Sequence, residues 1–300
     1  SVSPKRANRF SAEKPPRRSG NLWKSTVKDM DILETITANT RREVAWQKQA
    51  LPVDALLRLG SPWLAEAPCS MRRALAESET GVIAEFKRRS PSKGWLCRDA
   101  AIGAVVPAYE AGGASACSVL TDGGFFGGSL EDLKQARRLV RLPLLRKDFI
   151  VDEYQLYQAR TAGAAAVLLI AAVLSPEECR RLARTARELE LEVLLEVHTP
   201  AELSHLNGYV DMLGVNNRDL GTFRTDVENS FRMADRLRRE VGGGEGPLLV
   251  SESGISDPET VVRLRDASFR GFLMGEAFMK TGDPGRALAE FIVRLKEARP

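Results

Sequence analysis

The sequence contains few of the residues from which metal sites and disulfide frameworks are built. Its 300 residues include four cysteines and two histidines. The cysteines, which are Cys69, Cys97, Cys117 and Cys179, show no C-x-x-C spacing and form no cluster with histidine. We therefore expect no disulfide framework, no metal site and a reducing, cytoplasmic setting.

Long apolar runs are also missing. The longest apolar stretch, from Ala162 to Leu174, contains a glycine and is too short to span a bilayer. No apolar segment follows the basic residues near the start of the sequence, so we expect no secretory signal. A membrane is therefore not among the partners that the sequence predicts.

A surplus of positive charge is confined to residues 1–29. This segment holds eight Lys or Arg residues against two Asp or Glu residues, a net charge of +6, whereas the whole chain carries +4. The remaining residues therefore carry −2, which argues against nucleic acid as a partner. Residues 1–29 are rich in Ser, Pro, Lys and Arg and have almost no apolar periodicity, which predicts a flexible basic extension.

From residue 82 onward, strand-like apolar runs alternate with helical patterns. The expected strands are 82–87, 115–120, 144–147, 165–170, 192–197, 211–215, 248–251 and 270–275. The expected helices lie near 100–111, 129–140, 152–162, 176–190, 200–207, 227–240, 257–267 and 284–298. Strand ends recur about every 27 residues, close to the length of one βα unit. This alternation predicts an α/β fold in which parallel strands close into a single (βα)8 barrel, or TIM barrel.

A doubly wound open sheet is the alternative architecture. Such a sheet would usually carry a glycine-rich turn after its first strand, whereas residues 88–94 of this chain read RRSPSKG. The sequence therefore favours the barrel.

Helical periodicity also precedes the first expected strand. It predicts helices at about 31–51, 54–59 and 71–78. We expect this N-terminal helical extension to cover one end of the barrel, within a single domain that spans residues 30–300.

Charged residues recur where the expected strands end. Two lysines, Lys87 and Lys147, and two carboxylates, Glu85 and Glu196, would meet at one mouth of a closed barrel. Such a mixed cluster can keep one lysine protonated as an acid and one carboxylate ionised as a base. A structural network of salt bridges is the alternative interpretation. Lys87 could also neutralise a substrate phosphate.

The loops after the last two expected strands suggest an anion site. Gly254 and Gly275 occupy matched positions in the segments ESGI and MGEA. Glycine lets backbone N–H groups approach an anion closely, and these loops of a barrel commonly hold phosphate. The alternative is that both are ordinary turn glycines. We expect the two histidines, His198 and His205, to be ordinary surface residues.

These residues belong to a longer series of motifs that resembles one family. The series consists of segments 85–94, 118–122, 125–129, 144–151, 168–174, 195–198, 214–220 and 251–255. In this order they resemble indole-3-glycerol-phosphate synthase of tryptophan biosynthesis, over about residues 31–296. The resemblance implies a carboxy-lyase that converts 1-(2-carboxyphenylamino)-1-deoxyribulose 5-phosphate to indole-3-glycerol phosphate, releasing carbon dioxide and water. It implies no cofactor and no metal.

The resemblance also implies roles for individual residues. Lys147 would be the acid of ring closure, Glu196 and Glu85 would assist proton transfers, and Lys87 would act in the dehydration and reach the phosphate. Residues that match substrate-binding positions are Ser90, Phe149, Asn216, Arg218 and Leu273. Residues that match the phosphate cradle are Ser253, Gly254, Gly275 and Glu276. Some relatives carry Ser in place of Glu276, so we expect its carboxylate to point away from the phosphate.

Two other functions compete with this one. One is phosphoribosylanthranilate isomerase, the preceding step of the pathway, which shares the barrel but needs a cysteine and an aspartate at strand ends. Cys117 lies three residues before the end of its expected strand and so not at the mouth, which counts against this function. A catalytically silent barrel that binds a phosphorylated metabolite or a partner enzyme would be expected to lose Lys87, Lys147 or Glu196, and none is lost. The sequence thus predicts an enzyme with a small phosphorylated substrate, acting as a monomer.

Overall fold

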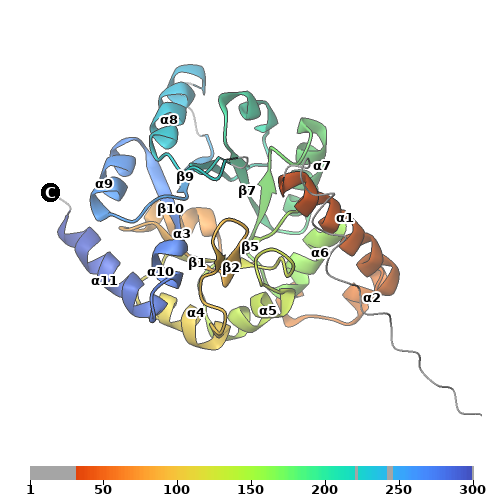
Figure 1. Ribbon diagram of the computed structural model, residues 1–300. Helices are drawn as coiled ribbons and strands as arrows, with labels where there is room; N and C mark the ends of the chain where they lie inside the picture. Colours follow the sequence, from red (N-terminus) through yellow and green to blue (C-terminus); the bar gives the residue numbers. More distant parts are fainter. Residues whose placement is uncertain (1–31, 220–221, 242–245, 299–300) are drawn as a thin grey trace, which may run out of the picture. The chain divides into compact units, whose positions relative to one another are not determined.

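The computed structural model describes residues 32–219, 222–241 and 246–298 (Figure 1). The chain divides into two units, Ser1–Asp31 and Ile32–Pro300, and the described residues all belong to the second. The flexible extension expected at residues 1–29 lies outside the described residues, so that expectation stays a prediction.

Eight parallel strands form a closed barrel in the order β1-β10-β9-β8-β7-β6-β5-β4. Their bounds are β1 (Val82–Phe86), β4 (Ala116–Leu120), β5 (Leu144–Lys147), β6 (Ala166–Ile170), β7 (Glu192–Val197), β8 (Met212–Asn216), β9 (Leu248–Glu252) and β10 (Phe269–Met274). The pairing of β1 with β10, for example Ile83 with Leu273, closes the sheet. The predicted (βα)8 barrel is therefore confirmed and the open sheet is wrong.

Helices follow the strands in sequence and surround the barrel (Figure 1). They are α4 (Ile102–Ala111), α5 (Leu130–Leu139), α6 (Glu153–Ala162), α7 (Pro176–Glu188), α8 (Glu228–Val241), α9 (Pro258–Asp266) and α11 (Pro284–Glu297). The segment expected as a helix near 200–207 is a short 3-10 helix, η2 (Pro200–His205), because Asn207 and Gly208 follow before an α-helix can propagate. The short helix α10 (Glu276–Met279) and the hairpin of β2 (Arg89–Ser90) and β3 (Gly94–Trp95) were not expected.

Local signals determine where the helices begin and end. The Ser175 hydroxyl accepts a bond from the N–H of Glu178, and the Glu178 carboxylate accepts one from the N–H of Ser175, a capping box that starts α7. Gly163 ends α6 with a φ of 86°, a left-handed conformation that favours glycine. These caps determine where the chain turns back toward the barrel.

Side chains alternate between two apolar cores along each strand. Leu144 packs in the outer core, between strands and helices, whereas Leu145 packs in the inner core, inside the barrel. The inner core also holds Ile83, Leu194 and Val250, one each from β1, β7 and β9. Because side chains alternate with a period of two, the residues two places further along these strands also face the interior. Those residues are Glu85, Lys147, Glu196 and Glu252.

The N-terminal helices cover both ends of the barrel. They are α1 (Ile32–Ala50), α2 (Val53–Arg58), the 3-10 helix η1 (Pro62–Leu64) and α3 (Met71–Glu77). The α3 residues Met71 and Leu75 are fully buried in the inner core, and the N–H of Arg72 bonds to Glu192, the first residue of β7, so α3 closes the amino end. Helix α1 contacts α6 at the opposite end (Figure 1). The expectation that these helices cover one end was therefore wrong. No described helix is long and apolar enough to cross a membrane.

Candidate active site

A cavity of about 420 Å³ opens at the carboxyl ends of the strands. Every residue that the sequence predicts for the site lines it. These residues are Glu85, Lys87, Ser90, Lys147, Phe149, Glu196, Asn216, Arg218, Ser253, Gly254, Leu273, Gly275 and Glu276. Helix α1 adds Ile32, Leu33 and Ile36 to the wall. The positions are those expected at the mouth of a barrel.

The Lys147 amine lies among three carboxylates at the floor of the cavity. Its Nζ is 3.7 Å from Glu85 Oε2, 4.0 Å from Glu196 Oε2 and 4.0 Å from Glu252 Oε2. Lys87 approaches the same cluster from the other side, with its Nζ 2.9 Å from Glu85 Oε1. The cluster therefore contains two cations and three carboxyl groups, one more carboxyl than predicted.

Burial and neighbouring charges shift the pKa values of these groups in opposite directions. Burial alone would raise the pKa of Glu85, but the charges of Lys87 and Lys147 outweigh it and lower that pKa to about 2. Burial alone would lower the pKa of Lys147, but Glu85, Glu196 and Glu252 outweigh it and raise that pKa. At neutral pH, Glu85 is thus an anion and Lys147 a cation.

Glu252 is the site residue that the sequence prediction missed. Its side chain is 1% exposed, and its carboxyl group lies beside that of Glu196. Burial and the neighbouring charge of Glu196 raise its pKa well above the usual range, so it binds a proton more tightly than an ordinary glutamate does. The signal was present, since Glu252 follows the interior residue Val250 by two places, but we assigned this strand end to the phosphate loop.

The predicted substrate-binding residues are linked to one another. Asn216 Nδ2 donates to Glu196 Oε1 over 3.1 Å, and Asn216 Oδ1 accepts from the backbone N–H of Arg218 over 3.0 Å. Arg218 Nη2 donates to Glu276 Oε2 over 3.0 Å, and its Nη1 donates to Ser92 Oγ over 3.2 Å. The Glu276 carboxylate is therefore directed toward Arg218.

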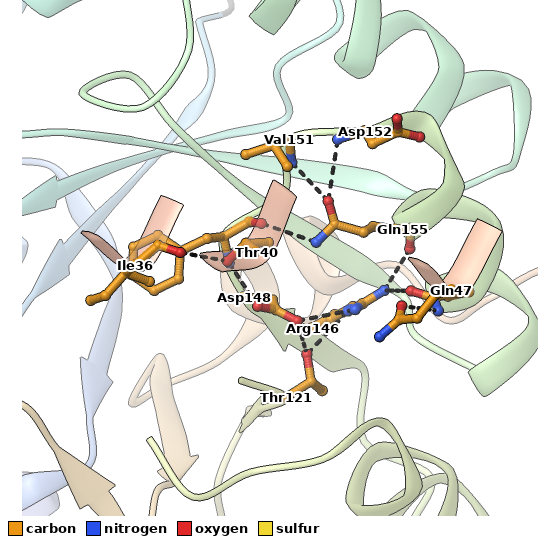
Figure 2. A network of polar contacts seen from close by, with 11 residues as sticks. Ile36, Thr40, Gln47, Thr121, Arg146, Asp148, Val151, Asp152 and Gln155 are labelled. Carbon is orange, nitrogen blue, oxygen red and sulfur yellow. Dashed lines mark hydrogen bonds and ion pairs between the residues drawn. The ribbon is translucent and has the colours of Figure 1, made fainter. Parts of the chain in front are cut away.

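A polar network outside the barrel fixes the end of β5 (Figure 2). The buried Arg146 guanidinium donates to Asp148 Oδ2 over 3.0 Å and to the carbonyl of Gln155 over 2.6 Å. The Gln155 side chain in turn accepts from the N–H of Val151 and donates to the carbonyl of Phe149. Because Arg146 anchors the strand on its outer side, its neighbour Lys147 is directed into the cavity, which Asp148 and Phe149 also line.

The two histidines are not ordinary surface residues, and that prediction was wrong. His205 is buried, with its ring nitrogens 2.7 Å from the carbonyl oxygen of Leu174 and 3.0 Å from that of Glu202. His198 places its Nε2 3.4 Å from Glu196 Oε1. The positions of both histidines depend on the direction that the chain takes after β7. Hydrophobic periodicity in the sequence does not reveal this direction.

Cys117 is fully buried in the outer core and does not line the cavity. Burial raises the pKa of its thiol, which makes it a poor acid–base group. A cysteine acid–base pair at this mouth is therefore excluded. Among the residues that the structure describes, no group of His, Cys, Asp or Glu side chains is arranged to hold a metal ion.

Comparison with known proteins identifies the family. The family model for indole-3-glycerol phosphate synthase matches residues 33–291. The chain belongs to the indole-3-glycerol phosphate synthase family. The synthase of Bacteroides thetaiotaomicron is 58% identical over 89% of this chain and 99% of its own. The synthase of Salinibacter ruber is 44% identical over 87% of this chain and 94% of its own. The synthase of Polaromonas naphthalenivorans is 43% identical over 87% of this chain and 98% of its own.

Solved structures support the fold alone. A tryptophan synthase α-subunit from Pyrococcus furiosus matches with a TM-score of 0.55 and 16% identity, covering 73% of this chain and 98% of its own. The tryptophan synthase α-subunit from Legionella pneumophila matches with a TM-score of 0.55 and 15% identity over 76% and 97%. At such identities the likeness shows a shared barrel, whereas the synthase family is shown by the sequence.

Proposed function

We propose that this cavity carries out the reaction of the synthase family, with Lys147 as the acid that closes the ring. The enzyme is a carboxy-lyase of tryptophan biosynthesis that forms indole-3-glycerol phosphate from 1-(2-carboxyphenylamino)-1-deoxyribulose 5-phosphate. The observation that carries the proposal is the position of the Lys147 amine among three buried carboxyl groups inside a cavity lined by every predicted substrate residue.

Ring closure needs an acid at the ketose carbonyl. As the aromatic carbon attacks the carbonyl carbon, the carbonyl oxygen becomes an alkoxide, which is more basic than an amine. The Lys147 ammonium, held charged by its three carboxyl neighbours, can protonate that oxygen. Phe149 and Leu273 line the cavity as apolar surface for the aromatic ring, and Arg218 and Ser90 are placed to orient the substrate carboxylate.

The later steps need both an acid and a base. Loss of carbon dioxide restores the aromatic ring, and a hydroxyl then leaves with acid assistance while a proton is removed. Glu252, whose pKa is raised by burial and by Glu196, suits the acid, and Glu196, which accepts a hydrogen bond from Asn216, suits the base. Lys87, paired with Glu85, is placed to assist the departing hydroxyl and to neutralise the phosphate.

The phosphate is proposed to bind the loops after β9 and β10. Ser253 and Gly254 are consecutive left-handed residues, with φ values of 68° and 77°, so the chain turns sharply beside the cavity. Gly275 has a further reason to be glycine, because an added Cβ would lie 2.8 Å from Glu85 Oε1. A substitution at Gly275 would therefore disturb Glu85 together with the phosphate site.

Ser253 offers a cleaner test of the phosphate site. Asn and Asp both tolerate a left-handed backbone, so Ser253→Asn and Ser253→Asp differ chiefly in charge. Inorganic phosphate should raise the unfolding temperature of the unmodified chain and of Ser253→Asn through binding linkage, but not that of Ser253→Asp. Thermal unfolding with and without phosphate measures this. If phosphate changed the unfolding temperature of the two variants equally, the proposal that phosphate binds these loops would be contradicted.

We further propose that the enzyme acts as a monomer in the cytoplasm. Every residue predicted for the site lines one cavity among the described residues of a single chain, which supports a monomer. Sedimentation of the purified chain tests the oligomeric state.

Turnover tests the proposed function itself. With the carboxyphenylamino substrate, the purified chain should generate steady-state indole fluorescence. An isomerase would interconvert phosphoribosylanthranilate and this substrate without forming indole, and a silent barrel would bind the substrate unchanged. Absence of indole fluorescence from a chain that still binds phosphate would contradict the proposal.

A further inference from the structure

His198 lies between two carboxylates just beyond the end of β7. Its Nε2 is 3.4 Å from Glu196 Oε1, and its Nδ1 is 3.6 Å from Glu202 Oε2. The side chain is 10% exposed, and neither ring nitrogen makes a hydrogen bond of normal geometry with any described residue. The ring is thus held at ion-pair distance from a buried site carboxylate on one side and from a more exposed carboxylate on the other.

The backbone holds this arrangement in place. Glu202 Oε2 accepts from the backbone N–H groups of His198 and Thr199, the latter over 3.2 Å. On the other side, Asn229 Nδ2 donates to the carbonyl of His198 over 3.0 Å. Glu202 therefore has a fixed position from which it can act on the ring.

Among the residues that the structure describes, three acidic side chains act on the charge of His198. They are Glu196 on β7, Glu202 on η2 and Asp219 beyond β8. Burial alone would lower the pKa of His198, but these carboxylates outweigh burial and raise it above its ordinary value. The imidazole consequently binds its proton more tightly than an ordinary histidine does.

Glu196 and Glu252 form an unequal pair. Both flank the Lys147 amine at 4.0 Å, so this cation favours neither of them. Glu196 also receives a hydrogen bond from Asn216 and faces His198, whereas no described amide or cationic side chain other than Lys147 is paired with the Glu252 carboxyl group. Two neighbouring buried carboxyl groups do not both ionise readily, so the better-supported one keeps the charge.

We propose that His198 is a positioning residue whose cation, held by Glu202, keeps Glu196 ionised and leaves the proton of the pair on Glu252. The inference deepens the proposed function and rests on it, because it assigns the base and the acid of the later steps. His198 does not line the cavity, so it acts through Glu196 and not on the substrate.

Variants at the two histidines separate charge from structure. In His198→Asn, the acid limb of the kcat/KM profile should move up by about one pH unit, because the cation beside Glu196 is gone. Activity relative to the unmodified chain should then fall toward about tenfold lower along the acid limb and be close to equal at pH 9. His205→Gln is the matched control, since His205 bonds to backbone carbonyls, and its profile should keep the original acid limb. A loss in His198→Asn that is equal at all pH values would overturn the proposal.

Proton NMR tests the same inference without turnover. The chain has two histidines, so His205→Gln assigns the remaining ring signal to His198. His198 should titrate above an ordinary imidazole, and Glu202→Gln should lower its midpoint by roughly half a pH unit or more. A midpoint at or below the ordinary value, or one unmoved by Glu202→Gln, overturns the proposal even if His198→Asn does not fold. Failure of the proposed function would appear separately, as missing turnover in the unmodified chain.

Discussion

Lys147→Ala should lower kcat by roughly a hundredfold or more, the usual scale for loss of a general acid. The Lys147 amine is the cation common to Glu85, Glu196 and Glu252, and its proton is used chiefly in the transition state of ring closure. Product binding should change much less, because the phosphate loops after β9 and β10 are intact. Steady-state kcat and the product Kd provide the two measurements.

Lys147→Arg is the control for charge alone. Arginine keeps the cation beside the carboxyl groups but holds its proton too tightly to be a useful acid, so it should restore stability and little activity. If Lys147→Ala kept a nearly normal kcat, the lysine would be structural, and Lys87, the other lysine of the buried cluster, would be the next candidate to close the ring.

Glu252→Gln should also lower kcat by about a hundredfold, through loss of a proton donor in the dehydration step. Glutamine has nearly the same shape and is uncharged, as protonated Glu252 is, so the barrel should fold normally. Shape matters here because Gly214 leaves space for Glu252, and any side chain at Gly214 would overlap it. Normal turnover in Glu252→Gln would show that Glu252 lines the cavity without donating a proton in the reaction.

The stability of Glu252→Gln should depend on pH in a predictable direction. The folded chain binds the Glu252 proton more tightly than the unfolded chain, because burial and Glu196 raise this pKa. That stabilisation is complete below the ordinary glutamate pKa of about 4.3 and is lost as the pH rises through the folded-state value. Glutamine does not titrate, so the variant should gain in unfolding temperature relative to the unmodified chain as the pH rises above the ordinary glutamate pKa. Glu85, whose pKa is lowered, contributes stability that is lost toward pH 2 in both proteins and cancels in the comparison.

Strand periodicity explains why much of the site could be predicted from the sequence. Lys147, Glu85 and Glu196 each follow an interior apolar residue by two places, so a closed barrel brings them together at one mouth. Arg146 and Asp148 alternate with Lys147, and their outward network with Gln155 fixes the strand end (Figure 2). The roles of these residues come from the family resemblance and stay predictions until the variants are measured.

Other features depend on contacts that periodicity does not contain. The position of α3 at the amino end of the barrel depends on Met71 and Leu75 filling the inner core and on the bond from Arg72 to Glu192. The position of His198 depends on Glu202 reaching back to its backbone. Such pairings between loops and helices arise from the folded path of the chain, which the sequence pattern leaves open.

The balance between carbon dioxide and indole tests the central claim most directly. The purified chain is incubated with substrate labelled at the carboxylate carbon, and released carbon dioxide and fluorescent product are counted together. We expect equal amounts of both from the unmodified chain, and both reduced by about a hundredfold or more in Lys147→Ala, because ring closure precedes decarboxylation. Full yields of both in Lys147→Ala would contradict a site in which Lys147 closes the ring. Carbon dioxide release without indole from the unmodified chain would contradict the dehydration step.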